Sequence, residues 1–496
     1  MARYAYEPLS AQDQSFLAFE RANVRMHVAA TQIFEAGNLK TPDGGIDVER
    51  YKRATEAALH LIPRYRMKLK WVPLLDRAVW VDDRHFNLDY HIRHTSLPRP
   101  GGMEQLSLLS ARIMSQPLDR SRPLWEIWVV EGLEGDRFAV ISKIHHCMID
   151  GASGVDLAMI LMSPEAHERI PEPVPYIPRP VPSSLELLRD EVLRRFSLPL
   201  QAVRGIAEFS RQTKDLGDDL RMRLRALGEL AGWAVTSASD TPMNGRLGPH
   251  RRFAWHSMPL DEVKAIRRTL GCTVNDIILA TVAGAIRGYM LRRRVDPDLL
   301  DFRTSAPVSV RRDDERGKLG NRVSSWIVRL PINEPDPIRR VEAIHQTTQD
   351  LKRSKQALGV EMMMAAAEWA PSILLSLGTR ASSGPINMIV TNVPGPQFPL
   401  YLLGAKLLEI YPMVPLLENM GLGIALLSYD GKVCWGYNSD YELVPDLPAV
   451  VEHVEQSFAE LRNAVRVRPV ELPKEPAPAA STAAPTAKAR GAHGAS

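Results

Sequence analysis

The spacing of apolar side chains over the first 170 residues predicts alternating helices and strands. Apolar positions recur with helical spacing over Arg50–Leu61 and Glu104–Met114. Shorter apolar or alternating runs predict four strands: Ala78–Val81, Tyr90–His94, Leu124–Val130 and Phe138–His146. The last two runs are separated by a short polar loop that contains two glycines, so we expect them to form a hairpin.

The second half of the chain repeats this mixture of elements. The pattern predicts a helix at Leu260–Thr269 and another that begins after Thr273. Four more apolar runs predict strands: Val323–Leu330, Ile386–Thr391, Leu422–Leu427 and Val433–Gly436. Alternating helices and strands in both halves indicate an α/β protein with mixed α+β character.

A proline-rich stretch divides the two halves. Six prolines fall between Pro171 and Pro182, which favours extended backbone and excludes the interior of a helix. Helical spacing returns from residue 183 to about 235. We therefore expect an N-terminal half at 1–170, a linker that is proline-rich and then helical at 171–249, and a C-terminal half at 250–472. Residues 473–496 are rich in Ala, Pro and Thr, and we expect a disordered tail.

Composition narrows the class of protein. The chain has 496 residues, whereas a single core rarely grows beyond about 250–300 residues, so a fold built from two halves is expected. Hydrophobic residues make up 45% and charged residues 24%, which excludes disorder over most of the chain. No uninterrupted apolar run reaches the ~18–20 residues of a membrane-spanning helix. The 62 basic and 58 acidic residues nearly balance, which argues against a nucleic-acid-binding protein.

The cysteines give little support to a disulfide framework or a zinc site. Cys147, Cys272 and Cys434 are an odd number, lie far apart and lack C-x-x-C spacing. The first eight residues contain no apolar core of a secretory signal. A reducing, cytosolic compartment is therefore the expectation.

The sharpest chemical feature is the segment Lys143–Gly151, in which a predicted strand ends in His145 and His146 and is followed by Asp150 and Gly151. A neutral histidine can take a proton from an alcohol, because its ordinary pKa is about 6.5. Successive strand residues point to opposite faces, so only one of the two rings can face a given cleft. Gly151 leaves room for a close backbone approach.

The residues alone also allow a structural role for this histidine pair. The two imidazoles diverge and no H-E-x-x-H is present, so no metal site is expected. Signatures of serine hydrolases, P-loops and dinucleotide-binding folds are also missing.

The arrangement H-H-x-x-x-D-G resembles the signature of the CoA-dependent acyltransferase superfamily, which includes chloramphenicol acetyltransferases, plant BAHD enzymes and peptide-synthetase condensation domains. Further segments look like those of bacterial wax ester synthase/diacylglycerol acyltransferases. They are Pro8–Leu17, Phe86–His94, Pro117–Trp125, Thr273–Ala280, Pro307–Arg311, Asn392–Pro396 and Ser428–Val433. The resemblance extends from about residue 6 to 465. One departure is Thr391, where the family often has serine.

The resemblance implies a fold and an activity. The fold would be two chloramphenicol-acetyltransferase-like halves, each a mixed sheet with helices, with an active-site tunnel between them. The activity would be acyl-CoA-dependent O-acyl transfer to diacylglycerol, to long-chain fatty alcohols, or to both, directly and without an acyl-enzyme. Acyl-CoA would be a substrate, and no cofactor is expected. We expect a cytoplasmic protein with peripheral contact to the inner membrane or lipid bodies.

The resemblance also implies roles for individual residues. His146 would be the proton acceptor, and His145 its non-catalytic partner turned to the other face. Asp150 would hold the loop by pairing with Arg311 or Arg64, and a second role in proton transfer is the rival interpretation.

Four further positions carry weaker expectations. Gly151 completes the motif, and Trp125 is expected to pack in the core. Asn275 has two open interpretations: capping of a helix start together with Thr273 and packing between the halves, or a hydrogen bond to the thioester oxyanion. Asn392–Pro396 is a Pro/Gly turn that we expect to cross between the halves.

Two other functions stay open at this point. A related fold could take acyl groups from a carrier protein, as in peptide-synthetase condensation or polyketide-associated acyl transfer. Alternatively, an inactive relative could bind lipid. The intact His146, Asp150 and Gly151 favour an active enzyme.

Overall fold

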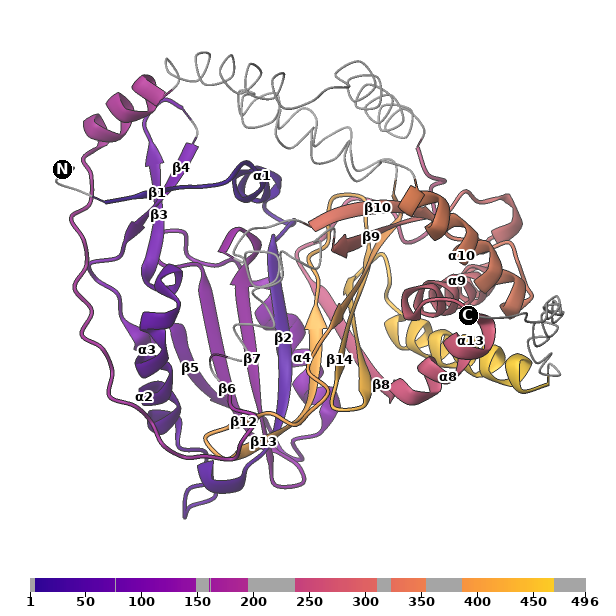
Figure 1. Cartoon of the computed structure of the whole chain (residues 1–496), viewed down its shortest axis with the longest axis horizontal. Coiled ribbons are helices and arrows are strands. Elements are labelled where there is room, and N and C mark those ends of the chain that lie inside the picture. Colours follow the sequence, from indigo (N-terminus) through magenta and orange to yellow (C-terminus); the bar gives the residue numbers. More distant parts are fainter. Residues whose placement is uncertain are drawn as a thin grey trace, which may run out of the picture.

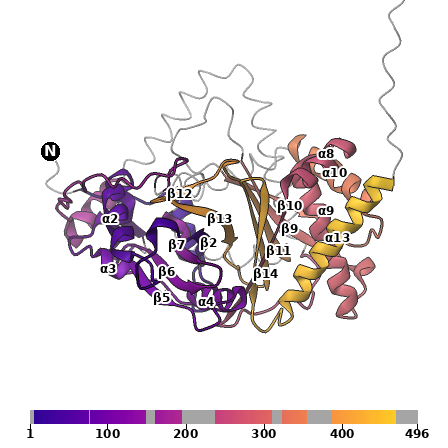
Figure 2. The same ribbon diagram turned by 90° about the horizontal axis from the view of Figure 1, so that it is seen from below.

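The computed structural model describes residues 5–75, 77–148, 160, 162–194, 237–309, 323–353 and 386–467. Over these residues the chain forms two six-stranded mixed sheets and one small three-stranded sheet. Figures 1 and 2 show the two large sheets side by side in the middle of the molecule, with most of the helices on their outer sides. This is the two-halved α/β architecture that the sequence predicts.

The first large sheet has the strand order β12-β13-β2-β7-β6-β5. Its strands are Tyr401–Leu402, Ala405–Met413, His27–Glu35, Arg137–His145, Trp125–Leu133 and Ile92–Ser96, in that order. β5 runs parallel to β6, and the remaining pairs are antiparallel. The helices of this half include α2 (Val48–Ala58), α3 (Leu88–His91) and α4 (Met103–Ser115). Apolar side chains fill both faces of the sheet.

The second large sheet has the strand order β10-β9-β11-β14-β15-β8. Its strands are Val323–Arg329, Arg303–Ser309, Met388–Pro394, Leu422–Tyr429, Lys432–Asp440 and Arg251–Pro259. Among the residues that the structure describes, four helices cover its outer face (Figure 1): α8 (Leu260–Leu270), α9 (Val274–Arg292), α10 (Pro337–Arg353) and α13 (Leu447–Val467). A large apolar core lies between these helices and the sheet.

A small sheet joins β1 (Glu7–Pro8), β4 (Arg77–Asp82) and β3 (Met67–Val72), and α1 (Ala11–Phe19) follows β1. The predicted proline-rich linker is extended, as expected, and contains no helix from 171 to 182. It is fixed to the first half because Arg179 forms an ion pair of 2.7 Å with Asp82. A helix follows at 184–194. The rest of the predicted helical linker, 195–236, and the predicted tail, 473–496, lie outside the described residues.

The two large sheets are linked by an exchange of strands. After β11 in the second sheet, the chain crosses at residues 395–400 and adds β12 and β13 to the first sheet. β13 pairs antiparallel with β2, for example Glu409 with Ile33. Asn392–Pro396 stands at this crossing, as the sequence predicts, although its first three residues belong to β11. Residues 401–413 are therefore part of the first sheet, although they fall within 250–472.

The backbones of the two sheets also approach each other closely, at β15 of the second sheet and β13 of the first. A Cβ atom added at Gly436 on β15 would lie 1.8 Å from the carbonyl oxygen of Pro412 on β13. Nearby, the rings of Trp255 on β8 and Tyr411 on β13 stack at 5.1 Å. Glycine is therefore required at this point of contact between the halves.

Most local predictions are confirmed. The helices at Arg50–Leu61 and Glu104–Met114 correspond to α2 with a following 3-10 turn and to α4. The hairpin corresponds to β6 and β7, which pair antiparallel. The strand predicted at Tyr90–His94 is wrong in its first two residues, because Asn87 accepts a hydrogen bond from the Asp89 N–H at 2.9 Å and starts α3.

One described helix, α9, has the length and mean hydropathy of a membrane span. However, 67% of its apolar window is buried inside the protein. It lies between α10 and α13 in the core of the second half. α9 is therefore a core helix.

Candidate active site

The histidine motif lies at the C-terminal end of β7, a central strand of the first sheet. His145 is the last residue of β7, and His146 begins a 3-10 turn, η4 (His146–Met148). The N–H of His145 donates to the carbonyl of Leu124 at 2.9 Å, and the N–H of His146 donates to the carbonyl of Met26 at 2.7 Å. Backbone hydrogen bonds to the residues that directly precede β6 and β2 therefore fix the end of β7. The two histidines have different surroundings, as strand alternation predicts.

The His146 ring stacks on Phe16 of α1, with ring centroids 4.0 Å apart and planes inclined by 28°. Its Nδ1 is buried and has no hydrogen-bond partner. Burial lowers the pKa of His146 to about 4, although its own backbone carbonyl acts in the opposite direction. The imidazole is therefore neutral near pH 7. Because Nδ1 is enclosed, Nε2 is the candidate nitrogen for taking up a proton.

The His145 ring lies in the core, with 1% of the residue exposed. Its Nδ1 accepts a hydrogen bond from the N–H of Cys147 at 3.1 Å. Its Nε2 lies 3.5 Å from a carboxylate oxygen of Glu20. The second oxygen of Glu20 lies 3.2 Å from Nε2 of His27, and Arg120 also binds this carboxylate.

Sequence reasoning missed Phe16, Glu20, His27 and Arg120. Phe16 lies inside the segment Pro8–Leu17 that carries the family resemblance, and Arg120 lies inside Pro117–Trp125. The family resemblance of these two segments was therefore the signal that could have identified Phe16 and Arg120 as site residues. What the sequence does not reveal is that α1, β2 and the loop before β6 meet behind the histidine motif.

Several predicted site residues cannot be placed. Asp150, Gly151 and Arg311 lie outside the described residues, and their roles stay predictions. Arg64 forms an ion pair of 2.9 Å with Glu7, and its guanidinium lies 4.7 Å from the centre of the Trp80 ring.

The start of α9 has a capping box. Thr273 is the N-cap and accepts from the N–H of Asp276 at 3.2 Å, and the Asp276 carboxylate accepts from the Thr273 N–H at 2.9 Å. Asp276 also accepts from Thr348 at 2.8 Å and contacts His345 at 2.7 Å, which joins α9 to α10. Asn275 is therefore not the capping residue. The oxyanion role of its amide stays a prediction.

Trp125 packs in the core, as predicted. Only 1% of it is exposed, and its Nε1 donates to the carbonyl of Tyr65 at 2.8 Å. The ring stacks on His91 with centroids 4.4 Å apart. Trp125 is the first residue of β6, so its packing fixes the start of the strand next to β7 in the core.

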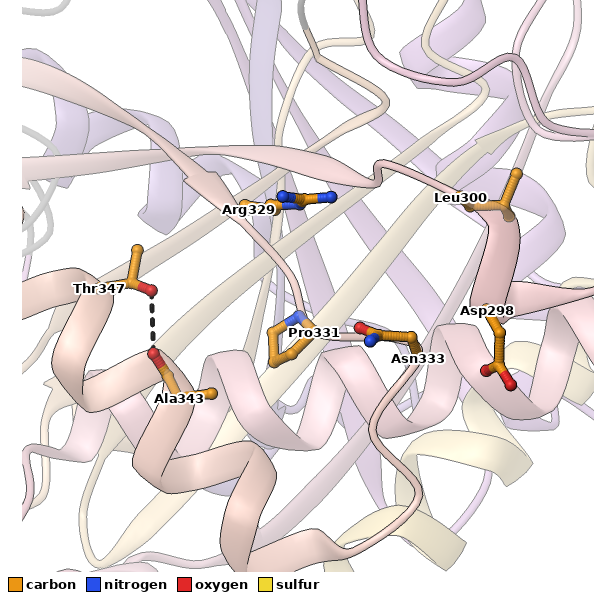
Figure 3. Close-up of a pocket in the computed structure, with 7 residues that line it drawn as sticks. All are labelled: Asp298, Leu300, Arg329, Pro331, Asn333, Ala343 and Thr347. Carbon is orange, nitrogen blue, oxygen red and sulfur yellow. Dashed lines mark hydrogen bonds between the residues drawn. The ribbon is translucent and has the colours of Figure 1, made fainter.

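A separate pocket of about 310 Å³ lies in the second half, between β10, α10 and the 3-10 turn at Pro297–Leu299 (Figure 3). Its lining residues are Asp298, Leu300, Arg329, Pro331, Asn333, Ala343 and Thr347. None of the motif residues lines it, so the pocket is distinct from the histidine site. Among the described residues, no group of three or more His, Cys, Asp or Glu side chains could hold a metal ion.

The fold places the chain in a class of acyltransferases. The first condensation domain of the calcium-dependent antibiotic synthetase shares it, with a TM-score of 0.59 at 14% identity over 94% of this chain and 97% of that domain. The wax ester synthase/diacylglycerol acyltransferase from Marinobacter aquaeolei VT8 matches with a TM-score of 0.65 at 25% identity, over 93% of this chain and 100% of the other. Both confirm the fold expected for the CoA-dependent acyltransferase superfamily.

Comparisons of sequence define the family. The wax ester synthase/diacylglycerol acyltransferase catalytic domain matches residues 9–278, and the C-terminal domain of the same family matches 319–462. A putative diacylglycerol O-acyltransferase of Mycobacterium tuberculosis is 32% identical over 472 residues, covering 92% of this chain and 90% of the relative. The chain belongs to the wax ester synthase/diacylglycerol acyltransferase family and is an acyltransferase.

Proposed function

We propose that this protein transfers the acyl group of a long-chain acyl-CoA to the hydroxyl of diacylglycerol or of a long-chain alcohol, with His146 as the base. The observation that carries the proposal is the neutral imidazole of His146 at the end of β7. The full-length match to a family whose members are named as diacylglycerol acyltransferases and wax ester synthases supports the two acceptors.

In the proposed reaction, Nε2 of His146 takes the proton of the acceptor hydroxyl while the hydroxyl oxygen attacks the thioester carbonyl carbon. The carbon–sulfur bond then breaks, and the departing CoA sulfur takes the proton from the imidazolium. The products are an ester and free CoA. The Cys147 thiol is a poor candidate for an acyl-enzyme, because burial raises its pKa well above the ordinary value.

The test uses purified protein and labelled palmitoyl-CoA, with dipalmitoylglycerol and hexadecanol offered separately and together. We expect labelled triacylglycerol, labelled wax ester or both, without any added metal or cofactor. The ratio of the products names the preferred acceptor. Ester formation only from an acyl carrier protein, or lipid binding without ester formation, would support one of the alternative functions instead.

The acceptors are poorly soluble in water, which supports peripheral contact of the protein with the inner membrane or lipid bodies. We expect the purified chain to float with vesicles that contain diacylglycerol and to be released by high salt or dilution. A protein that never leaves the soluble fraction in this assay would contradict the membrane contact.

The low pKa of His146 predicts an unusual pH dependence. Protonation of the base below its pKa stops catalysis, so kcat/KM of the wild type should stay constant from about pH 8 to about pH 5.5. Phe16→Ala exposes the ring to water and should raise the pKa of His146 toward its ordinary value of about 6.5. The variant should therefore lose activity below about pH 6.5, where the wild type does not.

The matched control is Phe19→Ala on the same helix, which removes a phenyl ring from the apolar cluster around Val24 and Met26 but leaves the stacking of Phe16 on His146 in place. Its acid limb should coincide with that of the wild type. Identical acid limbs near pH 6.5 in the wild type and in Phe16→Ala would show that the Phe16 contact does not control the base.

A further inference from the structure

Behind the histidine motif, one buried carboxylate holds together three elements of the first half. Glu20 is the C-cap residue of α1, and only 9% of its side chain is exposed. Its Oε1 lies 3.2 Å from Nε2 of His27 on β2, and its Oε2 lies 3.5 Å from Nε2 of His145 on β7. Arg120, in the loop before β6, donates from Nε to Oε2 at 3.1 Å.

The charges of this cluster follow from its contacts. Burial acts to raise the pKa of Glu20, but the close approach of the His145 and His27 rings outweighs it and lowers the pKa well below the ordinary value. Glu20 is therefore a carboxylate, and Arg120 supplies the opposite charge. Burial lowers the pKa of His27 to about 4, so this ring is neutral near pH 7.

The contacts of His145 also fix its tautomer. Nδ1 accepts a hydrogen bond from the N–H of Cys147, so in the neutral ring it carries no proton. The proton is therefore on Nε2, the atom that faces the Glu20 carboxylate. A carboxylate that faces one ring nitrogen of histidine sets which nitrogen is the donor and orients the ring.

This arrangement bears directly on His146. The N–H of Cys147, the residue that follows His146, is held by His145, and the N–H of His146 itself is held by the carbonyl of Met26. Met26 directly precedes His27, the other histidine at the carboxylate. One backbone hydrogen bond of the turn is therefore made by the His145 ring itself, and the other by the residue directly before His27.

We propose that Glu20 is a positioning residue for acyl transfer: through His145 and His27 it fixes the η4 turn and therefore the orientation of the His146 imidazole. The proposal rests on the function proposed above, in which His146 is the base. In this proposal His145, the first histidine of the motif, has a structural role: its ring is oriented by Glu20 and accepts the hydrogen bond from the N–H of Cys147. Glu20 itself contacts no substrate in this scheme.

The first test compares two buried carboxylates. Glu20→Gln should lower kcat about 10- to 100-fold, as loss of a supporting partner does at other sites. KM for acyl-CoA and for the acceptor should stay within about twofold, because the substrate-binding surface is unchanged. The control is Glu126→Gln on β6, which removes a carboxylate 5% exposed that faces Arg93 at 3.2 Å and Lys143 at 3.6 Å.

Glu126→Gln should lower the melting temperature to a similar extent while kcat stays within about twofold of the wild type. Equal losses of kcat in the two variants, in step with their losses of stability, would overturn the proposal. An effect of Glu20→Gln on KM alone would also overturn it.

A double-mutant cycle tests the route through His145. In His145→Asn, the amide oxygen can still accept from the Cys147 N–H, but the contact with Glu20 is lost. If Glu20 acts through His145, Glu20→Gln combined with His145→Asn should be no slower than the slower single variant, because interacting residues are not additive. Multiplied losses would show independent roles and contradict the proposal.

A spectroscopic measurement separates this proposal from the proposed reaction. In protein labelled with ¹⁵N-histidine, the His145 signals, assigned by their absence in His145→Asn, should show the Nε2–H tautomer, and this tautomer should be lost or mixed in Glu20→Gln. If the wild type forms no ester while this tautomer is present, the proposed reaction fails but the positioning contact stands. An Nδ1–H tautomer in the wild type overturns the positioning contact whatever the activity.

Discussion

His146→Ala is expected to reduce ester formation by about 10²–10⁴-fold, the usual contribution of a general base. The acceptor hydroxyl has a pKa far above neutral and needs a group that removes its proton as the new bond forms. The structure offers the neutral imidazole of His146, directly after β7, for this step. The product count with labelled palmitoyl-CoA measures the effect for both acceptors.

The side chain of His146 contributes to packing as well as to chemistry, because it stacks on Phe16. His146→Gln preserves most of the volume and separates the two effects. We expect it to be as inactive as His146→Ala but to melt closer to the wild type. Both variants should bind acyl-CoA, and added imidazole should restore part of the activity of His146→Ala.

His94→Ala is the matched control, since His94 lies on β5 with 44% of its side chain exposed. It should retain full activity. If His146→Gln keeps more than about a third of the wild-type rate, the base lies elsewhere. Residue 150, which the structure does not describe, would then be the next residue to test.

Gly436→Ala is expected to destabilise the protein by about 3 kcal/mol or more, at the upper end of what overpacking costs. The added Cβ would lie 1.8 Å from the carbonyl oxygen of Pro412, and a backbone oxygen within a sheet cannot move aside as a side chain does. The clash falls between the two large sheets, so relief requires the halves to separate. Soluble yield and thermal melting measure this effect.

Gly248→Ala is the control for this prediction. Its Cβ would lie 3.5 Å from the Asp440 carboxylate, which is an ordinary contact. We expect this variant to melt within about 1 kcal/mol of the wild type, as most substitutions without a clash do. A Gly436→Ala protein with wild-type melting and activity would mean that the sheets lie farther apart than described.

The sequence predicts best those elements that depend on local pattern. α2, α4 and the β6–β7 hairpin follow from helical spacing or alternation, and the histidine motif falls at a strand end, as expected. β2 was missed because Thr31 and Gln32 are buried in it, which breaks the apolar pattern of a core strand. The pairing of β13 with β2 was missed because the residue pattern of a strand does not show which distant strand it pairs with.

The site shows the same division. His145 and His146 are found from their own motif, since the relevant residues are adjacent in sequence. Glu20, His27 and Arg120 come from three separate segments and meet only in the folded protein. Glu, His and Arg are common on protein surfaces, so the sequence does not mark these three residues as part of a site. Only their contacts around the Glu20 carboxylate in the folded protein do so.

The exchange of strands has a consequence for synthesis on the ribosome. β2 is made early, but the strand that pairs with its outer edge, β13, ends at Met413. Until then the first sheet has an open edge of unpaired N–H and C=O groups, which is a template for aggregation. We expect nascent chains that end before residue 401 to need chaperone protection. We also expect separately expressed halves divided at the linker to be poorly soluble, because each lacks part of the shared structure.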